Sequence, residues 1–189
     1  MMLRDSGPAR SAEHASREQV RSLLPLLSGL RLFPKDWNAA AKAISASIAG
    51  VTIFILILDG FMFRRSLPVD YVAFYTSPLF PRTAVVGILA SLEEVKFRLL
   101  LMTALVIALS LWRRPLRPLA FIAVILACQF ANVGGLVVAD PLYASLRYLA
   151  VGSVWGLLYW RHGWVAALIG HGATHFILDP LLMVVLLHS

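Results

Sequence analysis

Long apolar stretches alternate with short clusters of arginine, aspartate and proline along most of the chain. A helix needs about 20 mostly apolar residues to cross the hydrocarbon core of a membrane. The charged clusters mark where such helices end. The pattern predicts an all-α fold, a polytopic transmembrane helical bundle with about five spans. The predicted spans are about Ala39–Phe63, Thr83–Trp112, Leu119–Ala139, Leu142–Trp160 and Trp164–Leu187, the last one interrupted at Asp179-Pro180.

Two further apolar segments are too short to cross a membrane. Ser22–Phe33 is broken by Pro25, and we expect it to lie at the membrane interface. Tyr71–Phe80 is expected to be re-entrant or interfacial. The chain therefore divides into a basic N-terminal lead-in with an interfacial segment, residues 1–36, and one helical membrane domain, residues 37–189.

Composition supports an integral membrane protein. Of 189 residues, 59% are hydrophobic and 14% are charged, whereas soluble domains have about 45–50% apolar and about 25% charged residues. The net charge of +7 is carried by the N-terminus and short loops. This distribution indicates a positive-inside orientation with the N-terminus inside, and not a nucleic-acid-binding protein. The single cysteine, Cys128, cannot form an intramolecular disulfide.

A charged cluster interrupts the second predicted span at Glu93-Glu94-Val95-Lys96-Phe97-Arg98. Each ionised side chain costs roughly 2.5–3.5 kcal/mol at the bilayer centre on insertion scales, so such residues need partners. Glu94 and Arg98 are four residues apart and share one helix face, which predicts an ion pair. Glu93 points about 100° away. The cluster is either a helix end that snorkels to the headgroups or a functional carboxylate, Glu93, beside a structural ion pair.

The last predicted span carries a second polar pattern. His171, His175 and Asp179 follow one another at four-residue intervals and form one stripe on a helix. Two histidines and an aspartate on one stripe favour a site over simple packing. Gln129 and Asn132, in the third predicted span, are typical of interhelical hydrogen bonding when considered alone.

These motifs resemble those of the CAAX-processing and bacteriocin-processing (CPBP, or Abi) intramembrane endopeptidases, which include the type II CAAX prenyl endopeptidases. Glu93-Glu94-x-x-x-Arg98 matches the first family motif. Gly156-Leu-Leu-Tyr-Trp-Arg161-His-Gly163, followed by His171-x-x-x-His175, is similar to the last. The resemblance covers roughly residues 83–180.

The resemblance implies hydrolysis of a peptide bond by a glutamate-activated water, without a metal or another cofactor. Glu93 would be the general base, and Glu94, held by Arg98, would orient it. His171 and His175 would stabilise the oxyanion, and Asn132 would help to hold the water. The substrate would be a membrane-tethered peptide or protein, and the location a bacterial inner membrane. We therefore expect Glu93, His171 and His175 to converge in a polar pocket inside the bundle.

The chain departs from the family pattern at two positions. The middle family motif is Phe-x-x-x-His, and if Phe130 is its phenylalanine, Gly134 replaces the histidine. Asn132 is the only polar residue between them. His175 occupies the position of the family's final Asn or Asp, and Asp179 follows one turn later.

Three alternatives remain open from the sequence. His171, His175 and Glu93 could supply three metal ligands with one open position. The glycine at position 134 also suits a non-catalytic membrane scaffold or immunity protein. A small transporter using the buried charges is disfavoured, because no inverted repeat is apparent.

Residue counting along the spans gives inconsistent depths for the predicted site. From an inner boundary at Trp112, Glu93 lies about 28 Å deep, whereas His171 counted from Gly163 lies about 12 Å deep, at 1.5 Å per residue. Their mean, taken with His175 and Asn132, falls in the outer half of the membrane. This predicts a cavity reached from the non-cytoplasmic side.

Overall fold

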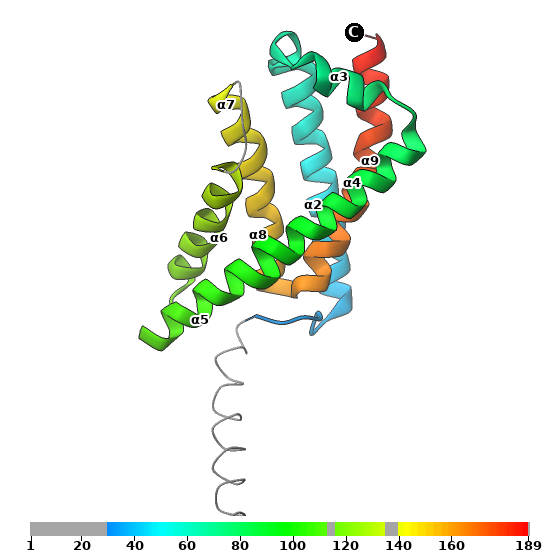
Figure 1. Ribbon diagram of the computed structural model, residues 1–189. Coiled ribbons are helices and arrows are strands. Elements are labelled where there is room, and N and C mark those ends of the chain that lie inside the picture. Colours follow the sequence, from blue (N-terminus) through cyan, green and yellow to red (C-terminus); the bar gives the residue numbers. More distant parts are fainter. Residues whose placement is uncertain (1–29, 113–115, 135–139, 189) are drawn as a thin grey trace, which may run out of the picture.

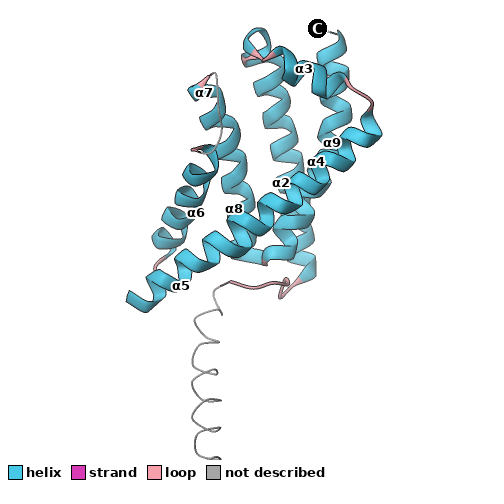
Figure 2. Cartoon of the chain, viewed as in Figure 1, coloured by secondary structure: helices cyan, strands magenta, loops and turns pink. Residues whose placement is uncertain are grey.

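The computed structural model describes residues 30–112, 116–134 and 140–188. All regular structure in these ranges is helical, and none of it is strand (Figure 2). The predicted all-α helical bundle is confirmed. The predicted lead-in lies mostly outside the described residues.

The first span consists of α2, Trp37–Ile57, which continues into η1, a π-helical turn at Leu58–Met62. Asp36 caps the start of α2, because its side chain accepts hydrogen bonds from the backbone of Asn38 and Ala39. A 3-10 turn, η2 (Arg64–Ser66), and a short helix, α3 (Val69–Thr76), follow. With 8 residues, α3 is too short to span, as the sequence predicts, and it lies across the end of the bundle where the C-terminus also lies (Figure 1).

The second span is one continuous helical segment that crosses the others obliquely (Figure 1). It comprises α4 (Leu79–Glu93), the π-helical η3 (Glu94–Met102) and α5 (Thr103–Trp112). Its 34 residues correspond to about 51 Å at 1.5 Å per residue. Because that exceeds a core of about 30 Å, depth counted along this helix overestimates true depth. The inconsistent depths derived from residue counting have this origin.

Two further helical segments come between the second span and the last helix. The first is α6, Pro118–Val133. The second is continuous from α7 (Pro141–Ala144) through the π-helical η4 (Ser145–Ala150) to α8 (Val151–His162). Gly163, with φ of 98°, then provides the left-handed turn into the last helix.

The last helix, α9 (Trp164–His188), lies at the centre of the packing. It contacts α2, α3, α4, α8 and η3. Its inward face contributes Ala166, Ala167, Leu178 and Leu182, which are fully buried. The predicted interruption at Asp179-Pro180 is wrong: Pro180 lies inside the continuous helix. Proline is tolerated inside the helices of a membrane bundle, and α9 is held here by the helices that pack against it, α2, α4 and α8. Arg82 also ties α4 to α9, because it donates to the carbonyl oxygen of Asp179 at 3.2 Å.

Three helices among the described residues are long and apolar enough to cross a membrane, namely Trp37–Met62, Leu79–Trp112 and Trp164–His188. The chain is accordingly an integral membrane protein. Two of the five predicted spans are not among these three. One of them, α6, has 16 residues, short of the usual 20, and the other, α7 to α8, contains the buried Arg147. The remainder of the predicted third span, residues 135–139, lies outside the described residues.

The described end of the lead-in contacts the turn between α8 and α9. The backbone N–H groups of Trp164 and Val165 donate to the carbonyl oxygens of Arg31 and Leu32 at 2.8 and 2.9 Å. These bonds satisfy two donors at the start of α9, which a helix cannot satisfy internally. The lead-in therefore fixes the end of the bundle at which α8 turns into α9.

Candidate active site

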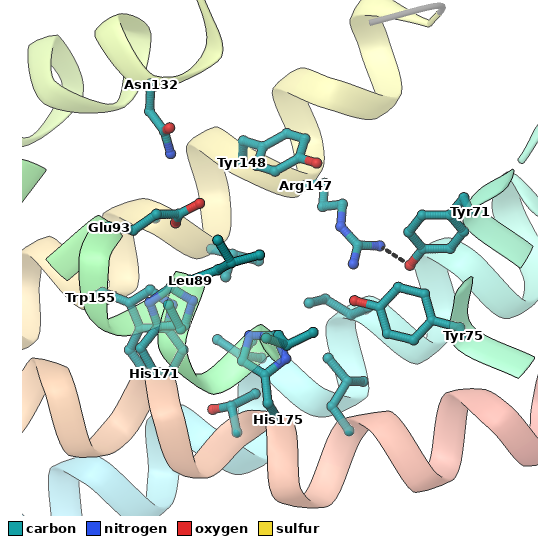
Figure 3. Close-up of a pocket in the computed structure, with 18 of the residues that line it drawn as sticks. Tyr71, Tyr75, Leu89, Glu93, Asn132, Arg147, Tyr148, Trp155, His171 and His175 are labelled. Carbon is teal, nitrogen blue, oxygen red and sulfur yellow. Dashed lines mark hydrogen bonds between the residues drawn. The ribbon is translucent and has the colours of Figure 1, made fainter. Parts of the chain in front are cut away.

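A cavity of about 310 Å³ lies inside the bundle, at the lower end of the range typical of ligand pockets. Its walls come from α2, α3, α4, η3, α6, η4, α8 and α9. One part is lined by Glu93, Asn132, His171 and His175, and the opposite part by tyrosines and Arg147 (Figure 3). The structure thus brings the predicted acid, amide and histidines to one cavity, whose remaining walls are largely apolar.

Glu93 is the last residue of α4 and is half-buried. Figure 3 shows its carboxylate and the Asn132 amide pointing toward one another from α4 and α6. No hydrogen bond or ion pair within the described residues engages the Glu93 carboxylate. It is therefore free to accept a proton from a water held in the cavity.

Glu94 begins the π-helical η3 and is completely buried. Its Oε1 lies 3.5 Å from Arg98 Nη1, so the predicted ion pair is present. The same oxygen lies 2.9 Å from His171 Nδ1, a contact that the sequence did not predict. Single turns of π-helix often occur at functional sites, and here the π segment holds both charged groups beneath the cavity.

The second terminal nitrogen of Arg98 fastens this helix to two neighbours. Nη2 donates to the carbonyl oxygen of Gly152 at 3.1 Å and to Gln129 Oε1 at 3.5 Å. A Cβ atom on Gly152 would lie 1.8 Å from Gln129 Oε1, so only glycine permits this approach. Gln129, a sequence candidate for interhelical bonding, has that role in the structure.

His171 is fixed from two directions. Its ring stacks on Trp155 with a centroid distance of 5.4 Å and an interplanar angle of 14°, while Nδ1 contacts Glu94. Only 12% of its side chain is exposed. Trp155 was not singled out from the sequence, because a tryptophan in an apolar span is ordinary core composition.

His175 lies one turn further along α9 and is held by Asp179. Nδ1 of His175 is 3.1 Å from Asp179 Oδ1, and the two histidine rings are 5.5 Å apart. The completely buried Asp179 also lies 3.5 Å from Thr83 Oγ1 and 4.0 Å from Arg82 Nε. The predicted stripe is therefore divided: two histidines face the cavity, and the aspartate supports the second of them from behind.

The carboxylate contacts determine what the histidines can do. Because a carboxylate accepts hydrogen bonds, each ring carries its hydrogen on Nδ1, which leaves Nε2 for the cavity. In a neutral ring Nε2 accepts a hydrogen bond, and in an imidazolium it donates one. The predicted oxyanion role thus requires the protonated ring.

Asn132 takes the inward position on α6. It is 9% exposed, whereas Phe130 is 61% exposed and faces away from the bundle. Gly134, four residues after Phe130, follows the last residue of α6. A histidine at position 134 would share the outward face of Phe130, so on this helix Asn132 is the polar group directed at Glu93.

The opposite end of the cavity adjoins a buried cluster that the sequence analysis missed. Asp59, completely buried in η1, accepts hydrogen bonds from Tyr71, Tyr143 and Arg147. Burial raises the pKa of the Tyr71 and Tyr75 phenols above their ordinary value, so both remain hydrogen-bond donors. Asp59 and Arg147 both lie inside predicted spans, where an ionised side chain is costly without a partner, and this was the sequence signal for the cluster.

No three His, Cys, Asp or Glu side chains among the described residues are grouped closely enough to hold a metal ion. Glu93, His171 and His175 line one cavity, but they do not form the three-ligand group that the metal alternative requires.

No protein-family model, no curated protein and no solved structure matches the chain.

Proposed function

We propose that this protein is an intramembrane endopeptidase of the CPBP type, which hydrolyses a peptide bond of a membrane-tethered peptide or protein. The observation that carries the proposal is the shared cavity. Glu93, Asn132, His171 and His175 reach it from three helices, and buried carboxylates hold both histidines. The motif resemblance supplies the class of reaction.

In the proposed reaction, Glu93 removes a proton from a water that Asn132 helps to hold. The water oxygen uses an electron pair to bond to the carbonyl carbon of the scissile bond, and the electron pair of the carbonyl double bond moves onto the carbonyl oxygen. His171 and His175, as imidazolium rings, donate from Nε2 to this oxyanion, the interaction that usually contributes most in acyl transfer.

The second half of the reaction returns the proton. Collapse of the tetrahedral intermediate breaks the carbon–nitrogen bond, and the protonated Glu93 gives its proton to the leaving nitrogen. The products are a carboxylic acid and an amine. Glu94, Arg98 and Asp179 act through their neighbours: the first two fix η3 and His171, and Asp179 fixes His175.

A membrane-peptide library tests this proposal. Purified protein should cleave at least one peptide, Glu93→Ala should abolish cleavage, and a chelator should not change it. Asp70→Ala is the matched control, because Asp70 is an exposed carboxylate outside the cavity. Cleavage that survives in Glu93→Ala would contradict the glutamic mechanism, and chelator-sensitive cleavage would support a metal. No cleavage by any variant favours the scaffold alternative.

We also propose that the N-terminus is inside, in a bacterial inner membrane. The lead-in packs on the α8–α9 turn near Arg161, which supports the inner location of this turn by the positive-inside rule. The end carrying α3 would then face outward. In a Cys128→Ser background, a membrane-impermeant thiol reagent should label Asp70→Cys in intact cells, and Arg161→Cys only after the cells are opened. The reverse labelling would overturn this orientation.

A further inference from the structure

The end of the cavity opposite Glu93 contains hydrogen-bond donors that the proposed chemistry does not use. Arg147, Tyr75 and Tyr148 line this end. Figure 3 shows the phenol oxygen of Tyr75 turned toward the Arg147 guanidinium, and the Tyr148 phenol beside the same arginine side chain. Three donor-bearing side chains from α3 and η4 thus face one small space.

Only one edge of the Arg147 guanidinium is occupied. Its Nη1 donates to Asp59, to Tyr71 at 2.6 Å and to Tyr143 at 2.8 Å. No hydrogen bond of the described residues involves Nε or Nη2 of this arginine. Since Arg147 is 8% exposed and lines the cavity, a ligand in the cavity can reach its Nε–Nη2 edge.

The two neighbouring phenols are also free to bind. Neither Tyr75 nor Tyr148 donates a side-chain hydrogen bond within the described residues, and neither hydroxyl is among the fully enclosed, unpartnered polar atoms. Tyr75 remains protonated for the reason given above. Both hydroxyls can therefore donate to a group placed beside Arg147.

This arrangement fits an anionic oxygen group. Arginine presents its Nε–Nη2 edge as a planar fork that matches the two oxygens of a carboxylate. Asp59 already binds the other edge, so it fixes the orientation of the guanidinium without occupying the fork. Two phenol donors would complete the coordination of a bound carboxylate.

We propose that Arg147, Tyr75 and Tyr148 form a specificity subsite for a carboxylate of the substrate, supplied either by its C-terminus or by an acidic side chain. This inference rests on the proposed function, because it places the substrate in the same cavity. The carboxylate lies at one end of the cavity while the scissile bond lies beside Glu93 at the other. The enzyme consequently cuts at a fixed distance from an acidic group.

Binding measurements separate this proposal from catalysis. The probes are fluorescent apolar peptides of one sequence in three forms: a C-terminal carboxylate, a C-terminal amide, and the amide form carrying one internal glutamate. They are titrated against Glu93→Gln protein in a zwitterionic detergent by fluorescence anisotropy. At least one carboxylate form should bind about tenfold more tightly than the plain amide, the factor expected of a charge-assisted hydrogen bond. The form that gains affinity identifies the source of the carboxylate.

Variants test the assigned residues. Arg147→Gln combined with Asp59→Asn keeps a neutral hydrogen-bonded pair, and it should remove the preference for the carboxylate. Arg147→Lys keeps a positive charge opposite Asp59 but loses the two parallel N–H donors of the guanidinium, so it should reduce the preference. This variant replaces the double variant in the test if the double variant does not fold. Arg161→Gln is the matched control, because this exposed arginine lies outside the cavity, and it should leave the preference unchanged.

Three results would overturn the subsite. These are the absence of any carboxylate preference, a preference that persists in both Arg147 variants, and equal competition by phosphatidic acid in mixed micelles, which would indicate a lipid phosphate site. Cleavage without a carboxylate preference would refute the subsite alone. Carboxylate-dependent binding without cleavage of any library peptide would refute the proposed function and leave the subsite standing.

Discussion

Removal of the Arg98 side chain tests the support beneath the cavity. Arg98 is 1% exposed, Glu94 is completely buried, and Nη2 of the arginine also joins η3 to Gly152. Arg98→Ala leaves the carboxylate with only His171 and opens a void where the guanidinium lies. Breaking a buried ion pair by removing one partner costs about 3–5 kcal/mol.

That free energy should be visible in thermal unfolding. For a chain of this size, 1 kcal/mol shifts Tm by about 2–4 °C, so the expected decrease for Arg98→Ala is roughly 6–20 °C. Tryptophan fluorescence in detergent measures it. The double variant Glu94→Gln/Arg98→Met should recover most of the loss, because an apolar or neutral replacement leaves no unpaired charge.

The control is Arg161→Ala, which removes an arginine with an exposed side chain and should change Tm by less than about 2 °C. If Arg98→Ala unfolds within that margin of the wild type, the pair between Glu94 and Arg98 does not hold η3, and the supporting role assigned to it is wrong.

Two further predictions concern neighbours of the cavity. Gly152→Ala should destabilise the protein by about 1–3 kcal/mol through overpacking, since the new Cβ would lie 1.8 Å from Gln129 Oε1; Gly87→Ala, which meets no atom within 4 Å, should be neutral or slightly stabilising in the same thermal assay. Asp179→Asn should lower kcat by up to about 10²–10³-fold, the loss expected for one oxyanion donor, with little change in KM, because a neutral amide would no longer stabilise the imidazolium form of His175 that donates to the oxyanion. An unchanged kcat in this variant would remove His175 from the mechanism.

The helical architecture was predictable because the length of the apolar segments and the charged residues at their ends determine it. The ion pair of Glu94 and Arg98 was predictable because residues four apart share one face of a helix. The contact between Glu94 and His171 was not, since it joins residues 77 positions apart in the sequence. The course of α9 through Pro180 was also mispredicted, because a proline is tolerated inside a helix that neighbouring helices pack against, and the packing of α2, α4 and α8 on α9 is not visible in the sequence.

The buried cluster at the opposite end of the cavity shows a different kind of omission. Asp59 and Arg147 were visible as ionisable residues in apolar stretches, and their cost in lipid predicts that each has a partner. Their pairing, across 88 positions, becomes apparent only when η1 and η4 are brought together. The sequence therefore shows which polar residues need a partner, whereas the structure is needed to show which residues pair.

The most direct test of the account is the kinetic effect of Glu93→Gln on a peptide that the wild-type protein cleaves. The variant keeps the size of the side chain and removes its basicity, so it should fold and bind like the wild type. We predict that kcat falls by about 10²–10⁴-fold, the usual contribution of a general base, while KM changes little. A variant that keeps more than about a tenth of the wild-type kcat would contradict the assignment of Glu93 as the water-activating base.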